Sequence, residues 1–83
     1  MKKFLYFSAT WCWPCRQLGP VMEQLSSQYP VRKIDIDTNQ LLTQQYNIIN
    51  IPTVLLIDDD GDVLASKVGV NPSQVYVDMY HQH

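Results

Sequence analysis

Apolar and polar positions follow a strand-like pattern and then a helix-like one in the first third of the chain. Lys3–Ala9 is an apolar, aromatic run, which predicts a buried strand. In the segment Cys12–Gln28 apolar side chains recur at helical spacing, so we expect an amphipathic helix with Pro14 in its first turn. Pro20 removes one donor from this helix and predicts a bend there.

A second strand and a short helix are expected next. Val31–Asp37 alternates apolar and charged residues, which predicts a strand with Lys33, Asp35 and Asp37 on one face. The following helix is expected to begin at a cap provided by Thr38 or Asn39 and to contain Leu41, Leu42, Gln45 and Tyr46.

Two further strands and a helix are expected in the last third. Thr53–Asp58 is a β-rich apolar run, and the turn signal Asp58–Gly61 predicts that Asp62–Gly69 returns as its antiparallel partner. Asn71 is expected to cap the last helix, with Pro72 at its first position. The expected packing face of this helix is formed by Val75, Tyr76, Met79 and Tyr80.

The predicted element order is β-α-β-α-β-β-α, which is an α/β fold. A helix joins the first two strands, so these strands should be parallel with a right-handed crossover, whereas the last two form an antiparallel hairpin. We therefore expect a mixed four-stranded sheet with helices on both faces. With 83 residues the chain is expected to form one domain, residues 1–83, and to act as a monomer.

Composition and charge exclude several functional classes. The formal net charge is −2 and no Lys/Arg cluster is present, so we expect no nucleic-acid surface. No apolar stretch is long enough to span a membrane. The apolar run Phe4–Phe7 is also too short for the core of a secretory signal. We expect a cytoplasmic protein, whose thiols are kept reduced.

Only two cysteines are present, Cys12 and Cys15, and two residues separate them. A purely structural disulfide at this spacing would close almost no loop and would constrain the unfolded chain little. A zinc site would need two more ligands, but His81 and His83 are spaced too closely for the usual pattern. The acidic run Asp58–Asp62 lacks the later glutamate of a calcium loop. We therefore expect no metal.

The remaining chemistry for the cysteine pair is redox exchange. The predicted helix presents free N–H donors and partial positive charge at its N-terminus. These groups stabilise a thiolate on Cys12 and lower its pKa, which favours nucleophilic attack near neutral pH. Cys15, one turn further into the helix, is close enough to form a disulfide with Cys12 and is expected to be the more buried of the two.

The segment "FSATWCWPCRQLGP" resembles the active-site segment of the thioredoxin family. Two further motifs extend the resemblance over nearly the whole chain. "KIDID" places Lys33 at the position of the family's buried lysine. "NIINIPTVLLIDDDGDVLASKVG" carries the sequence Ile51-Pro52-Thr53, which corresponds to the family's cis-proline, and the late glycine Gly69. The resemblance implies a minimal thioredoxin fold.

The resemblance also implies roles for individual residues. Cys12 would be the nucleophile and Cys15 the resolving cysteine, and a redox-active Cys12–Cys15 disulfide would serve in place of a bound cofactor. Pro52 would follow a cis peptide bond beside this pair. The implied substrate-binding residues are Trp11, Trp13, Pro14, Ile51, Pro52 and Gly69.

The chain departs from the family pattern in three ways. The family's first strand and helix are absent from the sequence, so Val31–Asp37 is expected to be an edge strand. Trp13 replaces the usual glycine between the cysteines. Tyr6 occupies the position of a buried aspartate that accepts a proton from the second cysteine. Because Tyr6 is a poor base, water, or Asp35 near Lys33, would have to accept that proton.

The resemblance implies a thiol–disulfide oxidoreductase that reduces protein disulfides. Its implied partners are disulfide-containing proteins, with ribonucleotide reductase as one candidate electron acceptor, and a thioredoxin reductase or glutathione as the reductant. The implied setting is a bacterium, or a phage in a bacterial host. Two alternatives stay open: a glutaredoxin-like, glutathione-dependent reductase, and a non-catalytic docking subunit with a thioredoxin fold.

Overall fold

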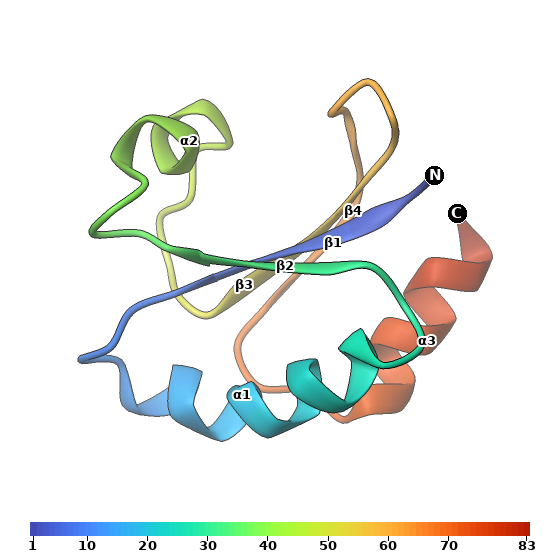
Figure 1. Ribbon diagram of the computed structural model, residues 1–83, viewed down its shortest axis with the longest axis horizontal. Coiled ribbons are helices and arrows are strands. Elements are labelled where there is room, and N and C mark those ends of the chain that lie inside the picture. Colours follow the sequence, from blue (N-terminus) through green and yellow to red (C-terminus); the bar gives the residue numbers. More distant parts are fainter.

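The computed structural model describes residues 1–83 and has the predicted order of elements (Figure 1). Several elements are one or two residues shorter at an end than expected, because these terminal residues lie in the connecting turns and loops. The elements are β1 (Lys3–Ser8), α1 (Trp13–Ser26), β2 (Val31–Asp35), α2 (Gln40–Gln45), β3 (Thr53–Ile57), β4 (Val63–Val68) and α3 (Ser73–Gln82).

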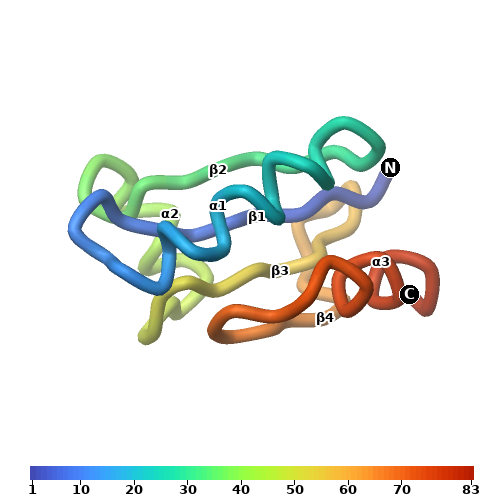
Figure 2. The backbone as a smooth tube through the Cα atoms, turned by 90° about the horizontal axis from the view of Figure 1, so that it is seen from below, coloured from blue at the N-terminus to red at the C-terminus, as the bar shows by residue number.

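The four strands form one mixed sheet in the order β2-β1-β3-β4, as Figure 2 shows from below. β1 and β2 are parallel, and their register pairs Phe4 with Val31 and Ser8 with Asp35. β3 is antiparallel to both β1 and β4. The predicted parallel pair, antiparallel hairpin and edge position of β2 are therefore confirmed.

Helices cover both faces of the sheet, as predicted. α1 and α3 lie along one face, whereas α2 lies on the opposite face, beyond the ends of the strands in Figure 1. The two chain termini lie near each other at the side of the sheet away from α2. No helix is both long and apolar enough to cross a membrane.

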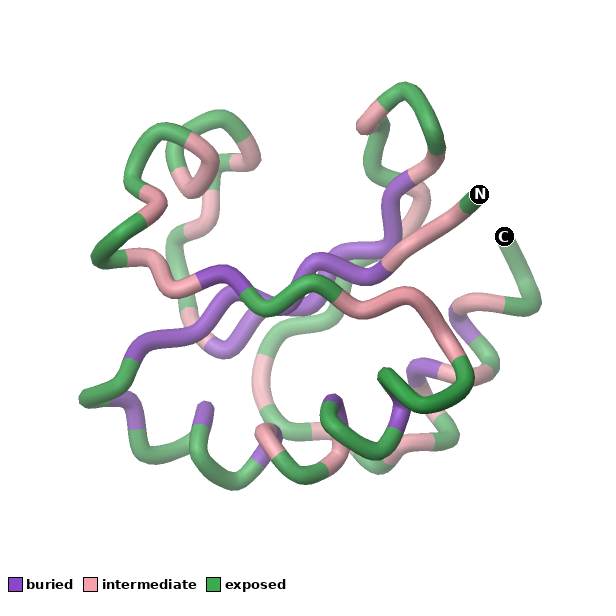
Figure 3. Tube along the Cα trace, viewed as in Figure 1, coloured by how far each residue is buried: buried purple, intermediate pink, exposed green.

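The core has two halves because β1 and β3 are buried on both of their faces (Figure 3). Alternate side chains of β1 point to opposite sides: Phe4 and Tyr6 pack against α1 and α3, and Leu5 and Phe7 pack toward α2. Residues three or four apart on α1 complete the first half. These buried α1 residues are Leu18, Met22 and Leu25.

α1 continues through Pro20 as one unbroken helix. The helix begins at Trp13 rather than Cys12, because Cys12 has an extended backbone and is the N-cap residue. It ends at Ser26, and the turn that follows it leads to Pro30. The predicted helix was therefore correct in its type and packing face, but one residue too long at its start and two at its end.

The start of α3 and its packing face both differ from the prediction. Pro72, not Asn71, is the N-cap residue. The Asn71 side chain instead donates to the Tyr76 hydroxyl over 3.3 Å, which holds the preceding loop against the helix. Val77 packs against the core beside Tyr76, Met79 and Tyr80, and Val75 does not. Buried Tyr76 lies at the centre of the packing face of α3, and the neighbour that shares this face is Val77 rather than Val75.

Candidate active site

The two cysteines lie at the N-terminus of α1, just after the end of β1. They are joined by a disulfide, and their Cα atoms are 5.3 Å apart. The Cys12 N–H donates to the Ala9 carbonyl over 3.2 Å, which closes the loop between strand and helix. Both members of the predicted pair are thus held at one helix end.

Cys12 caps the helix with its own sulfur. The Cys15 backbone N–H donates to Cys12 Sγ over 3.2 Å, and the Arg16 N–H donates to the Cys12 carbonyl over 3.3 Å. When the disulfide is reduced, the same N–H group and the positive end of the helix dipole favour negative charge on Cys12. The geometry therefore supplies the thiolate stabilisation that the spacing predicted.

Burial does not distinguish the two cysteines. The exposed fraction is 5% for Cys12 and 4% for Cys15, so the expected greater burial of Cys15 amounts to one percentage point in the disulfide form. Both sulfurs belong to one small apolar cluster with Ala9, against which Ile36 and Ile51 pack. The disulfide holds Cys12 in this cluster as firmly as Cys15.

Two exposed tryptophans neighbour the buried cysteines in the loop and first turn of α1. Trp11 and Trp13 are each 66% exposed, and Pro14 is also exposed. The Trp11 indole N–H donates to Asp37 Oδ2 over 2.9 Å. This bond fixes one ring beside the cysteine loop, where the ring presents apolar area to solvent.

A second loop, before β3, approaches the cysteines from another part of the chain. The Ile51–Pro52 peptide bond is cis, as predicted, and Pro52 is buried. The Ile51 carbonyl oxygen lies 4.0 Å from Cys12 Sγ. The Gly69 N–H donates to the Pro52 carbonyl over 2.9 Å, and Gly69 has φ +87°, a conformation that favours glycine. The fold thus joins Ile51, Pro52 and Gly69 in one region next to Cys12.

Tyr6 lies beneath the second cysteine. Its hydroxyl donates to the Cys15 carbonyl over 2.7 Å, and its side chain is buried. Burial raises the pKa of Tyr6 above its ordinary value of about 10. Tyr6 is therefore an even poorer proton acceptor at neutral pH than an exposed tyrosine.

Lys33 is exposed, so the buried position implied by the family resemblance is wrong. It lies on β2, which is an edge strand, and no additional element covers it. Lys33 and Asp35 nevertheless line a cavity of about 800 Å³, together with Tyr6 and Cys15. This cavity was not predicted from the sequence. The feature of the sequence that could have indicated it is the group of small residues in its lining, Ser8, Ala9, Gly19 and Ser26.

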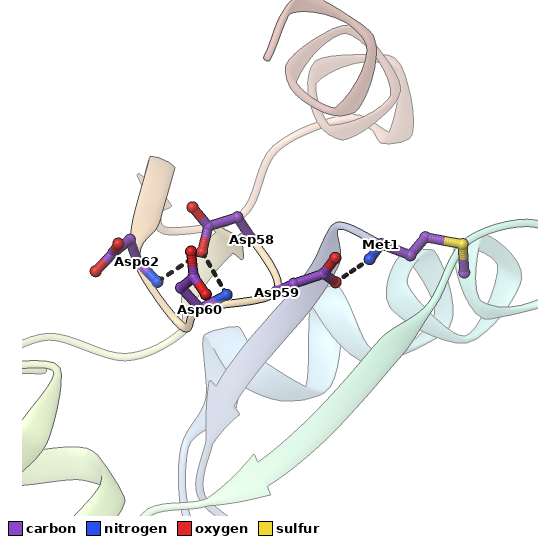
Figure 4. Close-up of polar contacts among 5 residues, drawn as sticks. All are labelled: Met1, Asp58, Asp59, Asp60 and Asp62. Atoms are coloured by element: carbon purple, nitrogen blue, oxygen red, sulfur yellow. Dashed lines mark hydrogen bonds and ion pairs between the residues drawn. The ribbon is translucent and has the colours of Figure 1, made fainter.

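The acidic turn between β3 and β4 is explained by its own hydrogen bonds. Asp58 Oδ1 accepts the N–H groups of Asp60 and Asp62, at 2.9 and 3.0 Å, and Asp59 pairs with the N-terminal ammonium of Met1 (Figure 4). The side chains of Asp58, Asp60 and Asp62 lie within 4.8 Å of one another. Their arrangement is that of a turn closed by an aspartate side chain.

Comparison with known proteins supports the same family. The family model described as Thioredoxin matches residues 2–81. The thioredoxin of Bacillus subtilis is 35% identical over an alignment of 81 positions that covers 93% of this chain and 77% of that protein. The thioredoxin of Haemophilus influenzae is 35% identical over an alignment of 83 positions that covers 95% of this chain and 77% of that protein.

Solved structures agree with the sequence comparisons. A mutant thioredoxin from Halobacterium salinarum superposes with a TM-score of 0.88 at 35% identity, covering 98% of this chain and 73% of that one. The chain therefore belongs to the thioredoxin family and is a thiol–disulfide oxidoreductase, with Cys12 and Cys15 as its redox-active disulfide.

Proposed function

We propose that this protein reduces disulfides in other proteins, with Cys12 as the nucleophile and Cys15 as the resolving thiol. The Cys12 thiolate attacks one sulfur of a substrate disulfide, and the other substrate sulfur leaves as a thiolate that takes up a proton. Cys15 then attacks Cys12 Sγ, releases the second substrate thiol and forms the Cys12–Cys15 disulfide. Two electrons pass from the protein to the substrate in each cycle.

The observation that carries this assignment is the cap at the start of α1. Cys12 Sγ accepts the Cys15 N–H at the positive end of the helix, whereas no corresponding hydrogen bond reaches Cys15 Sγ. This asymmetry favours the thiolate on Cys12 and leaves Cys15 to act second.

The surface around the disulfide is suited to docking an extended polypeptide. Trp11, Trp13 and Pro14 offer exposed apolar and aromatic area on one side of the cysteines, and aromatic side chains are enriched where proteins bind one another. On the other side lie Ile51, Pro52 and Gly69. We assign substrate contact to these two groups.

Family membership implies disulfide-containing substrates and a reductase that restores the dithiol. We further propose that the reductant is a thioredoxin reductase, that the protein acts as a monomer in the cytoplasm, and that ribonucleotide reductase is one candidate acceptor. Glutathione is the less favoured reductant, because the stretch Lys67–Gln74 has one glycine and no acidic residue. Glutaredoxins usually have a pair of glycines and an acidic residue at the corresponding stretch, which bind glutathione.

An insulin-reduction assay with two reductants tests this proposal. We expect insulin to be reduced when NADPH and a bacterial thioredoxin reductase regenerate the dithiol, and about tenfold more slowly with glutathione and glutathione reductase. Faster turnover with glutathione would contradict the proposed electron donor. Omitting this protein from each mixture measures the uncatalysed rate.

A further inference from the structure

The cavity beneath α1 borders Cys15. It has a volume of about 800 Å³, and α1, β1 and β2 line it. Figure 1 shows α1 running alongside these two strands. Since a water molecule in liquid occupies about 30 Å³, this space admits several waters. The cavity therefore gives water a route to the neighbourhood of Cys15, although the residue itself is only 4% exposed.

In the proposed reduction of protein disulfides, on which this inference rests, the second step is the attack of Cys15 on the mixed disulfide. This step needs a route by which the Cys15 proton can leave. Cys15 must lose its proton before or while it attacks Cys12. An ordinary cysteine thiol has a pKa of about 8.5 and is mostly protonated at neutral pH. A proton acceptor near Cys15 would therefore speed the step.

The charged and titratable groups around the cavity offer few acceptors. Arg16 on α1 and Lys33 on β2 are cations and act only as donors. Tyr6 on β1 already donates its hydroxyl proton to the Cys15 carbonyl. Only two carboxylates remain in the lining, Glu23 on α1 and Asp35 on β2.

Topology places Asp35, not Glu23, at the end of the cavity near the cysteines. Asp35 pairs with Ser8, the last residue of β1 before the cysteine loop. The next residue, Ile36, donates its N–H to the Ser8 carbonyl over 3.0 Å and packs against the cysteine cluster. Glu23 follows Cys15 by eight residues on one helix, which is about 12 Å along the axis.

The Asp35 carboxylate is also held in place with one oxygen free. Asp35 Oδ1 accepts the Asp37 N–H over 2.8 Å, and Oδ2 accepts no hydrogen bond from the protein. The residue is half-buried, unlike the exposed Glu23. One oxygen therefore orients the group, and the other is available to water.

We propose that Asp35 accepts the Cys15 proton through water in this cavity while Cys15 attacks the mixed disulfide. The Cys15 S–H bond breaks, and its proton passes by way of water to Asp35. The Cys15 sulfur forms a bond to Cys12 Sγ, and the bond between Cys12 and the substrate sulfur breaks. The leaving substrate thiolate is protonated by solvent, and Asp35 returns its proton to solvent.

The reaction of the reduced protein with a sub-stoichiometric amount of 5,5′-dithiobis(2-nitrobenzoate) separates the two steps. Attack by Cys12 releases one coloured thiolate, and attack by Cys15 releases the second. At pH 7 we expect Asp35→Asn to slow the second release about 10- to 100-fold, near the lower range of general-base catalysis, and to leave the first unchanged. At about pH 9.5, where hydroxide takes the proton, the difference should disappear.

Two further variants make the test specific. Asp35→Glu should recover most of the second rate at pH 7, and Glu23→Gln should match the unmodified protein in both phases. The proposal is overturned if Asp35→Asn leaves the second rate unchanged, if its defect persists at about pH 9.5, or if Glu23→Gln causes the defect instead. A missing second release in the unmodified protein would contradict the proposed function itself.

Discussion

Replacing Cys12 with serine is expected to lower the rate of insulin-disulfide reduction by roughly 10⁴-fold or more, to the uncatalysed background. Cys12 Sγ is the sulfur capped by the Cys15 N–H, and a serine hydroxyl at that position cannot form the mixed disulfide. The remaining thiol, Cys15, is inside the first turn of α1, and no hydrogen bond to its sulfur corresponds to the one that Cys12 accepts. The turbidity of precipitating insulin chains measures the loss.

Cys15→Ser is the matched control for this variant. It should still form a mixed disulfide through Cys12 but fail to resolve it, so mass spectrometry should detect a stable adduct with a disulfide substrate. Cys12→Ser should give no adduct. If Cys12→Ser kept its reductase activity, or if Cys15→Ser gave no adduct and Cys12→Ser did, the assigned roles would be wrong. A cellular function that survives Cys12→Ser would indicate the docking subunit instead.

Replacing Phe4 with alanine is expected to lower the free energy of unfolding by about 3–5 kcal/mol. Phe4 has no exposed surface, and its ring centroid lies 6.3 Å from that of Tyr29, 6.4 Å from Tyr76 and 5.6 Å from Tyr80. The substitution leaves a cavity where α1 and α3 meet the sheet. Because small domains have only about 5–15 kcal/mol of stability, this loss would be a large fraction of the margin.

Urea unfolding followed by circular dichroism measures this effect, and Leu41→Ala is its control. Leu41 is 84% exposed on α2, so its truncation should change the free energy of unfolding by less than about 0.5 kcal/mol. Equal losses for Phe4→Ala and Leu41→Ala would contradict the described core. The contrast between these two apolar residues tests burial rather than hydrophobicity.

The type and order of every element could be predicted from the sequence because apolar periodicity records which faces are buried. β1 and β3 appear as apolar runs since both of their faces are covered. β2 alternates since one of its edges and part of its surface meet water. Local pattern is sufficient where burial follows the period of the element.

Details that depend on tertiary contacts could not be predicted. Asparagine is a residue type that often caps helices, but the Asn71 side chain donates a hydrogen bond to the Tyr76 hydroxyl instead. Val75 and Val77 are equivalent in a short apolar pattern until the position of buried Tyr76 decides between them. The Asn71 bond spans only five residues, but both this bond and the packing of Val77 depend on how α3 lies against the core, which the local apolar pattern does not specify.

In the active site, too, some features could be predicted from the local sequence and others depend on tertiary packing. The cysteine spacing and the following helix predicted the redox pair, and its position at the helix N-terminus followed from the strand before it. The exposure of Lys33 and the cavity beside Cys15 depend on what covers β2 and on how small side chains line α1 and β1. Those features arise only when the sheet and helix are packed together.

The reduction potential of the Cys12–Cys15 couple tests most directly whether this protein reduces disulfides. A strong oxidant stabilises its thiolate with additional donors or positive charge between the cysteines, but Trp13 offers one indole N–H and Pro14 has no N–H. The nearby Arg16 guanidinium donates to the Thr10 carbonyl over 3.1 Å. The helix terminus therefore supplies most of the stabilisation.

Equilibration of the protein with a glutathione redox buffer measures this potential. We expect a value of about −270 mV, typical of thioredoxins, raised by tens of millivolts at most because Tyr6 replaces a buried carboxylate. A value in that range means that electrons flow from Cys12 and Cys15 to substrate disulfides. A value above about −180 mV, the potential of protein disulfide isomerase, would contradict this direction and show that the protein forms disulfides.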